Sequence, residues 1–179
     1  DDASEYARSD LLSRVLVFEG YSHNQIFGKD TAKRRDVGPG SVTLKLTNSG
    51  MSTSVYDLLV ILGPTASGKT TLAAHWAARN GGEILSADSR QVYRGMTIGT
   101  GKDLSDYEIP GFGRVPCHLT DIADAGYHYN VFEYQRDFLR AFEEVRSRGK
   151  VPVLCGGSGM YIEAVLSGYR LIQVSPDLA

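Results

Sequence analysis

Short apolar runs alternate with helical patterns along residues 51–179. Four runs have the length and composition of buried strands, and they span residues 58–62, 83–86, 115–119 and 151–155. Three helical segments lie between or after these runs, at residues 69–79, 131–148 and 160–167. Strands that alternate with helices in this way are typical of a parallel sheet flanked by helices. The pattern therefore predicts an α/β fold.

The segment at residues 131–148 carries clear signals for both ends of a helix. Asn130 is a typical N-cap residue, and Glu133 completes a capping-box pattern three positions later. Gly149 follows the segment at a position where glycine commonly ends a helix. Apolar side chains recur at helical spacing at Phe138, Phe142 and Val145. We therefore expect these side chains to belong to the core rather than to a cofactor site.

Residues 1–50 do not continue the alternating pattern. They lack an initiator methionine, whereas Met51 followed by Ser-Thr-Ser resembles a start. Two strand-like runs, at residues 14–18 and 41–46, flank a polar stretch that contains Lys33-Arg34-Arg35. We expect this basic triplet to lie in a solvated loop, with phosphate contact as the alternative. The sequence thus predicts an unassigned prefix at residues 1–50, either a fused module or an artefact, and a main domain at residues 51–179.

Composition narrows the class of protein. A hydrophobic fraction of 42% in 179 residues indicates one domain with a proper core. The net charge of -2 gives no support for nucleic-acid binding through the overall charge of the protein. Cys117 and Cys155 have no metal-site spacing, and Cys155 ends an apolar run, which favours a buried thiol in a reducing compartment. No apolar run reaches the roughly 18 residues of a membrane helix, and no signal peptide opens the chain. We therefore expect a cytoplasmic protein without a membrane partner. The sequence leaves its oligomeric state open, and a monomer is the default expectation.

Residues 63–70 match the pattern of a phosphate-binding loop, which is common to nucleotide-binding and ATP-binding proteins. Because the loop joins a predicted strand to a predicted helix, its backbone N–H groups are expected to surround an anion. Lys69 adds a positive charge, and the Thr70 hydroxyl is placed to hold Mg²⁺. The sequence therefore predicts a site for a di- or triphosphate, formed by Gly63, Pro64, Thr65, Ala66, Ser67, Gly68, Lys69 and Thr70.

A carboxylate follows the second predicted strand at Asp88. Since the carboxyl ends of parallel strands face the ligand crevice, we expect Asp88 to lie close to the phosphate loop. Its carboxylate can coordinate Mg²⁺ through water or accept a proton from a nucleophile, and an Asx turn or a helix cap is an equal alternative. Arg90, Gln91 and Arg94 extend the polar rim, and an amide side chain suits the edge of adenine.

Four motifs, in this order, resemble the tRNA dimethylallyltransferase (isopentenyl-diphosphate:tRNA transferase) family. They are the phosphate loop, Ser-Ala-Asp-Ser-Arg-Gln-Val-Tyr-Arg-Gly-Met-Thr-Ile-Gly-Thr at 86–100, His-Leu-Thr-Asp-Ile at 118–122 and Gly-Gly-Ser-Gly-Met-Tyr at 156–161. The resemblance covers about residues 55–175, and the second motif is specific to the family. It implies a P-loop NTPase-like sheet. It also implies transfer of a dimethylallyl group from its diphosphate to N6 of adenosine 37 in the tRNA anticodon loop.

The resemblance also implies roles for individual residues. The phosphate loop grips dimethylallyl diphosphate rather than ATP, and Asp88 is the base. Ser89, Arg90 and Gln91 contact the tRNA together with Asp88. Ser158 lines the channel in which these contacts are made. The family usually has threonine at this position, and serine keeps the hydroxyl group.

Such a transfer also requires that the departing pyrophosphate be stabilised. The loop N–H groups, Lys69 and a Mg²⁺ ion held by Thr70 and, through water, by Asp88 are expected to do this. The family's chain continues past the position of Leu171 with a helical insertion that grips the tRNA stem. The sequence is therefore expected to be part of a longer enzyme or a truncated relative.

Three other functions compete with tRNA prenylation. A small-molecule P-loop kinase would need an arginine-rich lid, which is not seen between Gly99 and Val131. An adenylate isopentenyltransferase of cytokinin type shares the loop and the aspartate, but its sequence usually differs from Gln-Val-Tyr at the positions that match residues 91–93. A non-catalytic nucleotide-binding module is the third alternative.

Overall fold

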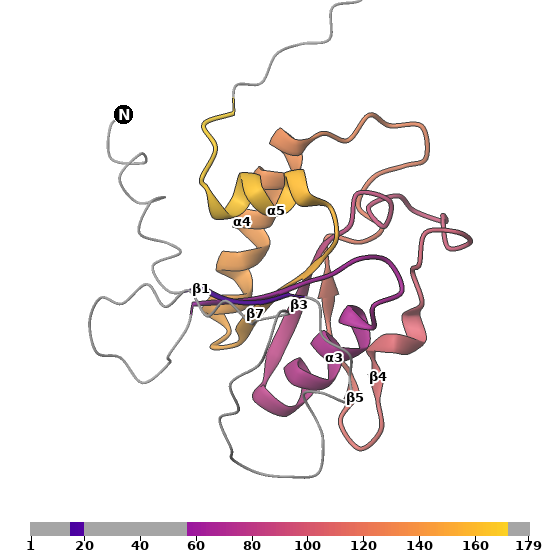
Figure 1. Ribbon diagram of the computed structural model, residues 1–179, viewed down its shortest axis with the longest axis vertical. Helices are drawn as coiled ribbons and strands as arrows, with labels where there is room; N and C mark the ends of the chain where they lie inside the picture. The colour runs from indigo at the N-terminus through magenta and orange to yellow at the C-terminus, as the bar shows by residue number, and fades with distance from the viewer. Residues whose placement is uncertain (1–14, 20–56, 172–179) are drawn as a thin grey trace, which may run out of the picture.

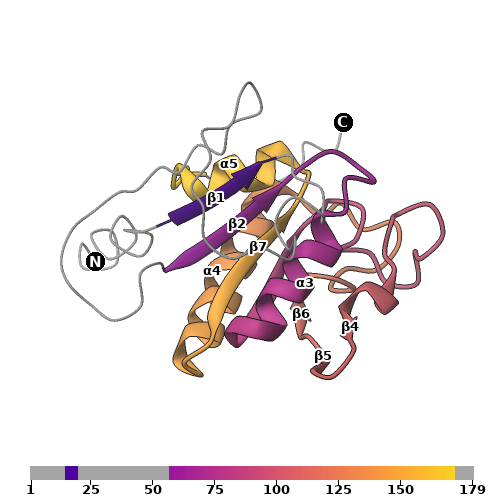
Figure 2. The same cartoon turned by 60° about the horizontal axis from the view of Figure 1, so that its bottom comes forward.

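The computed structural model describes residues 15–19 and 57–171, and it confirms the expected α/β fold. Parallel strands form one sheet in the order β1-β2-β7-β3-β6. The strands are β1 (Val15–Glu19), β2 (Leu58–Leu62), β3 (Gly82–Ala87), β6 (Cys117–His118) and β7 (Val151–Gly156). Figures 1 and 2 show α4 (Val131–Ser147) and α5 (Gly159–Leu166) on one side of the sheet and α3 (Lys69–Asn80) on the other.

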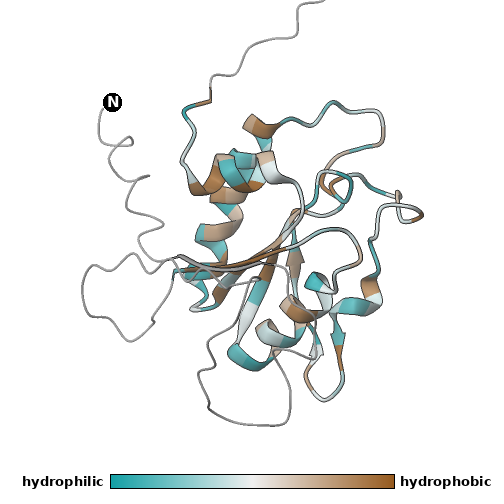
Figure 3. Ribbon diagram, in the orientation of Figure 1, coloured by the Kyte–Doolittle hydropathy of each residue, from teal (hydrophilic) through white to brown (hydrophobic). Residues whose placement is uncertain are grey.

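The core consists of two apolar layers, one on each face of the sheet. Figure 3 shows the strands as hydrophobic ribbons between helices of mixed character. Because successive strand residues point to opposite faces, neighbours in β2 enter different layers. One layer packs against α4 and α5 and includes Leu58, Val60, Leu85 and Leu154. The other packs against α3 and includes Leu59, Ile61, Ile84 and Val153. Burial on both faces explains why the strands read as continuous apolar runs.

The predicted helices are confirmed almost to their ends. In α4 the Asn130 side chain accepts a hydrogen bond from the Glu133 N–H at 3.0 Å, and the Glu133 carboxylate accepts one from the Asn130 N–H at 3.2 Å. The helix ends at Ser147, and Gly149 adopts the expected left-handed conformation with φ of 68°. The aromatic stripe predicted for the core is fully buried. No helix in the described ranges has the length and hydropathy needed to cross a membrane.

The strand predicted at residues 115–119 is shorter in the structure. Only Cys117 and His118 form β6, and Leu119 leaves the extended conformation with φ of 65°. Val115 instead donates its N–H to the Tyr107 carbonyl at 2.9 Å. This contact lies beside a short helix and a hairpin that the apolar pattern did not predict, namely η1 (Leu104–Tyr107), β4 (Glu108–Ile109) and β5 (Gly113–Arg114).

Part of the prefix joins the same sheet. The strand-like run predicted at residues 14–18 is observed as β1, which pairs in parallel with β2 from Val15 opposite Leu58 to Glu19 opposite Leu62. The run at residues 41–46, the basic triplet at 33–35 and Met51 lie outside the described residues. The division of the chain near residue 51 stays a prediction.

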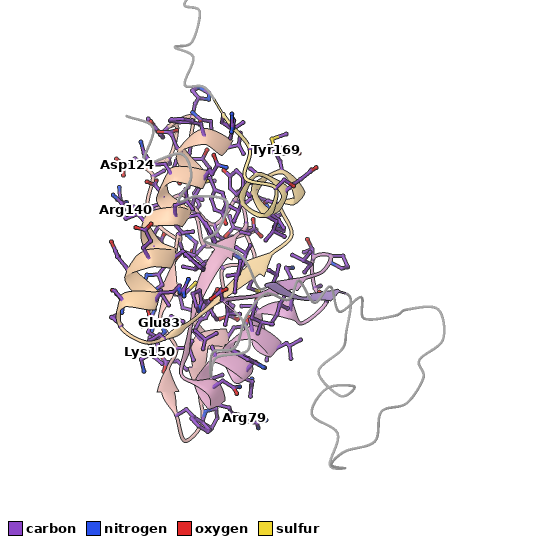
Figure 4. All side chains as sticks on the ribbon, turned by 90° about the vertical axis from the view of Figure 1, so that its left-hand side faces the viewer. Arg79, Glu83, Asp124, Arg140, Lys150 and Tyr169 are labelled. Carbon is purple, nitrogen blue, oxygen red and sulfur yellow. The ribbon has the colours of Figure 1, made fainter. Side chains whose placement is uncertain are left out.

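A cluster of charged and polar side chains around the buried Glu83 ties β3 and β6 to the end of α4. The Glu83 carboxylate lies 2.7 Å from His118 Nε2 and accepts a hydrogen bond from Arg148 Nη2 at 2.6 Å. Figure 4 shows Glu83 and Lys150 in the lower half of the view, and Asp124 and Tyr169 near the top. Since Glu83 is the second residue of β3 and Asp88 follows its last residue, the cluster stabilises the fold away from the candidate site.

This cluster predicts a pH dependence of stability. Burial raises the pKa of Glu83, but hydrogen bonds and charge from Arg148 and His118 outweigh burial and hold the pKa below its usual value. A lowered carboxyl pKa stabilises the fold above the ordinary value of about 4.3, and this contribution is lost as the pH falls. We expect the free energy of unfolding, measured with urea, to fall less steeply below about pH 5 in Glu83→Gln than in wild type. The exposed Glu143→Gln is the control, and equal slopes for Glu83→Gln and wild type would contradict the prediction.

Candidate active site

A cavity of about 370 Å³ lies beside the phosphate loop and the carboxyl ends of β3 and β7. Eight of the predicted site residues line it: Thr65, Ala66, Gly68, Lys69, Thr70, Asp88, Arg90 and Gln91. The other five do not line it, and they belong to the loop or to the turns beside the cavity: Gly63, Pro64, Ser67, Ser89 and Ser158. The fold thus brings the phosphate loop and the segment after β3 to one place, as the sequence predicted.

The phosphate loop connects β2 to α3 through two left-handed residues. Ala66 has φ of 63° and Gly68 has φ of 78°. Such strain in a non-glycine residue persists where the surrounding structure fixes it, and it concentrates at functional sites. The N-terminus of α3 has no side-chain cap and no acidic residue in its first turn. Its first N–H groups and its positive dipole end are therefore available to an anion.

Lys69 and Cys155 lie at the rim and the floor of this cavity. Lys69 Nζ donates a hydrogen bond to the Pro64 carbonyl at 3.1 Å, which holds the ammonium group across the loop in an exposed position. The Cys155 thiol is buried beneath the loop, 3.6 Å from the Lys69 carbonyl. Burial raises the pKa of Cys155 to about 12, so the thiol is neutral at physiological pH. The predicted buried free thiol is confirmed, and it gives the floor no charge that would compete with an anion.

Asp88 takes part in a turn and also lines the cavity. Its Oδ1 accepts a hydrogen bond from the Arg90 N–H at 2.9 Å and lies 3.6 Å from Arg90 Nε. The first contact is the Asx turn that the sequence left open as an alternative. Both contacts use Oδ1, which leaves Oδ2 to act on a ligand. The turn and a chemical role are therefore compatible, because the turn orients the carboxylate that lines the cavity.

Ser158 braces the segment that carries Asp88. Its Oγ accepts a hydrogen bond from the Ser89 N–H at 2.8 Å and lies 3.1 Å from Ser89 Oγ. Its own N–H donates to the Ala87 carbonyl at 3.0 Å. The turn after β7 thus holds the residues on both sides of Asp88. Sequence reasoning missed this contact because the two serines are 69 positions apart.

Gly156 allows β7 to lie close to the end of β3, which leads to a prediction. A Cβ at this position would overlap the carbonyl group of Ala87, the residue before Asp88. We expect Gly156→Ala to lower the free energy of unfolding by about 1–3 kcal/mol, as overpacked cores do. Gly159→Ala is the matched control, because no atom lies within 4 Å of a Cβ added there. Equal stability of the two variants in urea titration would contradict this reading.

Gln91 lines the cavity but uses its amide within the protein. The side chain is buried, its Oε1 accepts a hydrogen bond from Ser86 Oγ at 3.3 Å, and its Nε2 donates to the Gly101 carbonyl at 3.2 Å. In this arrangement Gln91 joins β3 to the turn at Gly101. The predicted contact between Gln91 and tRNA stays a prediction.

Two side chains that line the site and one buried lysine outside it were not singled out in the sequence. Asp106 places a second carboxylate in the cavity, 3.4 Å from Thr71 Oγ1, and Tyr107 lines the same wall. Lys102 is 1% exposed in its side chain and donates from Nζ to the Tyr93 carbonyl at 2.8 Å and to Asp121 Oδ1 at 2.7 Å. A lysine in a glycine-rich loop carries no local signal of burial, so only the structure identifies it.

Comparisons with known proteins agree with these motifs. Residues 91–178 match the family model described as IPP transferase. The tRNA dimethylallyltransferase 2 of Bacteroides fragilis is 66% identical over 119 residues, which cover 66% of this chain and 39% of the relative. The tRNA dimethylallyltransferase 1 of Parabacteroides distasonis is 62% identical over 125 residues, covering 69% of this chain and 40% of the relative.

Solved structures give the same result for the fold. The full-length tRNA isopentenylpyrophosphate transferase from Bacillus halodurans is 40% identical with a TM-score of 0.59, over 68% of this chain and 39% of that one. The chain spans 39% and 40% of the length of the two curated relatives named above. Sequence identities of 40% to 66% are well above those that a shared fold alone requires. The chain therefore belongs to the tRNA dimethylallyltransferase (IPP transferase) family.

Proposed function

We propose that this protein transfers a dimethylallyl group from dimethylallyl diphosphate to N6 of adenosine 37 in the anticodon loop of tRNA. The observation that carries the proposal is one cavity lined both by the phosphate loop and by Asp88. The relatives named above support a prenyl rather than a phosphoryl transfer. A further structural neighbour, a eukaryotic dimethylallyltransferase acting on tRNA, is 32% identical with a TM-score of 0.54 over 59% of this chain and 25% of that one.

The proposed reaction requires a base because the exocyclic amine of adenine is a poor nucleophile. Its lone pair is delocalised into the ring, and N6 must lose a proton as it forms the new bond. N6 attacks C1 of the dimethylallyl group, the bond from C1 to the diphosphate oxygen breaks, and pyrophosphate leaves with the electron pair. Asp88 takes the N6 proton, with the carboxylate held by the Arg90 N–H in the orientation described above.

The phosphate loop stabilises the leaving group in this proposal. N–H groups at the start of α3 and the Lys69 ammonium group offset the charge that grows on the pyrophosphate. Among the described residues, no three His, Cys, Asp or Glu side chains form a metal cage. Thr70 and Asp88 both line the cavity and carry oxygen donors of the kind that Mg²⁺ prefers, so Thr70 and, through water, Asp88 would hold this ion. When bound, Mg²⁺ would supply further positive charge to the pyrophosphate.

The acceptor adenosine must leave the stack of the anticodon loop to reach Asp88. In the proposed complex Ser89, Arg90, Gln91 and Ser158 contact the tRNA beside the cavity. Internal hydrogen bonds hold Gln91 and Ser158 in position for this contact, and the half-exposed Arg90 is available to phosphate. We propose that the protein acts as a monomer in the cytoplasm, where tRNA is modified.

A labelling experiment separates the proposed function from its alternatives. The intact protein is incubated with labelled dimethylallyl diphosphate and tRNA, AMP or no acceptor, and in parallel with ATP labelled on its γ-phosphate. The proposal expects prenyl label in tRNA alone. Label in AMP would indicate an adenylate isopentenyltransferase, phosphoryl transfer would indicate a kinase, and binding without transfer would indicate a nucleotide-binding module.

A further inference from the structure

A second cavity lies next to the first. Its volume is about 510 Å³, and it shares Arg90 and Thr100 with the cavity that contains Asp88. The rest of its wall includes the aromatic residues Tyr93, Tyr127 and His128, of which Tyr93 also packs against the core. Because the two cavities share wall residues, a ligand in the second would lie beside the reacting groups in the first.

The wall of the second cavity contains exposed apolar side chains and one positively charged side chain. Ile98 is 96% exposed and Tyr127 is 52% exposed, so large apolar surfaces face solvent in the described structure. The Arg90 side chain is also about half exposed, and its nearest acidic contact is the 3.6 Å approach to Asp88. A nucleotide satisfies both features, because its base stacks on aromatic rings and its phosphate pairs with arginine. A prenyl chain has no charged or hydrogen-bonding group that could contact Arg90 and His128.

The ring-bearing segments around this cavity are held in place before any ligand binds. The Tyr93 carbonyl accepts a hydrogen bond from the buried Lys102, and Thr100 Oγ1 donates to the Met96 carbonyl at 2.7 Å. Tyr127 Oη donates to Glu133 Oε1 at 2.6 Å, and Glu133 belongs to the capping box of α4. A wall fixed in this way loses little conformational entropy when a flat ligand stacks on it.

We infer that this second cavity binds an unpaired RNA nucleotide adjacent to the acceptor adenosine, with its base stacked on Tyr127. The inference rests on the proposed function, since it takes the RNA acceptor as given. Single-stranded RNA is commonly read by bases that unstack and lie against aromatic side chains. The chemistry of Tyr93, His128 and Arg90 fits a base with its ribose phosphate, and it makes Tyr127 a binding residue for the acceptor.

The test uses a single-stranded RNA heptamer that contains the acceptor adenosine and carries 2-aminopurine on its 5′ or its 3′ side. Stacking on an aromatic ring quenches 2-aminopurine fluorescence, so the intact protein is expected to quench one of the two probes. Tyr127→Ala is expected to weaken binding about 5- to 100-fold and to remove the quenching. Tyr127→Phe should keep both, because it loses only the hydroxyl that contacts Glu133. The exposed Phe112→Ala, in the β4–β5 hairpin, is the control.

Two further measurements distinguish failure of this inference from failure of the proposed function. Binding of dimethylallyl diphosphate to Tyr127→Ala should equal that of wild type, because Tyr127 does not line the first cavity. A wild-type protein that transfers the prenyl group but quenches neither probe, or a Tyr127→Ala variant that keeps affinity and quenching, would overturn the inference. Quenching without prenyl transfer would overturn the proposed function and leave the nucleotide site supported.

Discussion

Asp88→Asn is expected to lower the turnover of dimethylallyl transfer by about two to four orders of magnitude, the usual worth of a general base. Asparagine keeps the size of the side chain, and its oxygen can still accept the Arg90 N–H that forms the Asx turn. It cannot accept a proton from N6 at neutral pH. Affinity for dimethylallyl diphosphate should change little, because the lost interaction is made in the transition state.

The measurement compares single-turnover rates and calorimetric affinities for wild type, Asp88→Asn and Asp106→Asn. Asp106 is the matched control because it is a second carboxylate that lines the same cavity. If Asp88 acts chiefly by holding Mg²⁺, diphosphate binding should weaken and added Mg²⁺ should recover the rate. Near-native turnover of Asp88→Asn would rule out both roles and leave Asp88 as a residue of the turn.

Lys69→Ala is expected to weaken binding of dimethylallyl diphosphate by about 1.5–3 kcal/mol, or roughly 10- to 150-fold. The ammonium group is a charge-assisted donor beside the phosphate loop. In the described structure the ammonium group donates an exposed hydrogen bond to the Pro64 carbonyl, so removal of the side chain should cost the fold little.

Isothermal titration calorimetry with dimethylallyl diphosphate checks this expectation, and urea titration checks that the variant is folded. Lys150→Ala provides the control, because this exposed lysine lies at the other end of the sheet, near Glu83 in Figure 4. Unchanged affinity in Lys69→Ala would mean that backbone N–H groups alone hold the diphosphate.

Local signals were sufficient to predict the main elements and the phosphate loop. In α4 the capping residues Asn130 and Glu133 are three positions apart, so a helix start can be read from neighbouring letters. The loop between β2 and α3 is also contiguous in sequence, and the rule that strand ends meet at one sheet edge correctly placed Asp88 beside it.

Features that depend on distant contacts could not be predicted in this way. The brace from Ser158 to Ser89 joins two turns far apart in the chain, and the burial of Lys102 depends on Asp121 in a later loop. The shortness of β6 follows from the left-handed conformation of Leu119, which apolar periodicity does not reveal. The second cavity likewise forms from two loops that meet only after folding.

In the proposed function, the protein prenylates adenosine 37 of tRNA in the cavity that the phosphate loop and Asp88 line together. Mass spectrometry of nucleosides from tRNA incubated with the intact protein and dimethylallyl diphosphate tests it most directly. The account predicts N6-dimethylallyladenosine at position 37 with wild type and at least a hundredfold less with Asp88→Asn at equal times. Unmodified tRNA with wild type, under conditions in which the protein binds dimethylallyl diphosphate, would contradict the account.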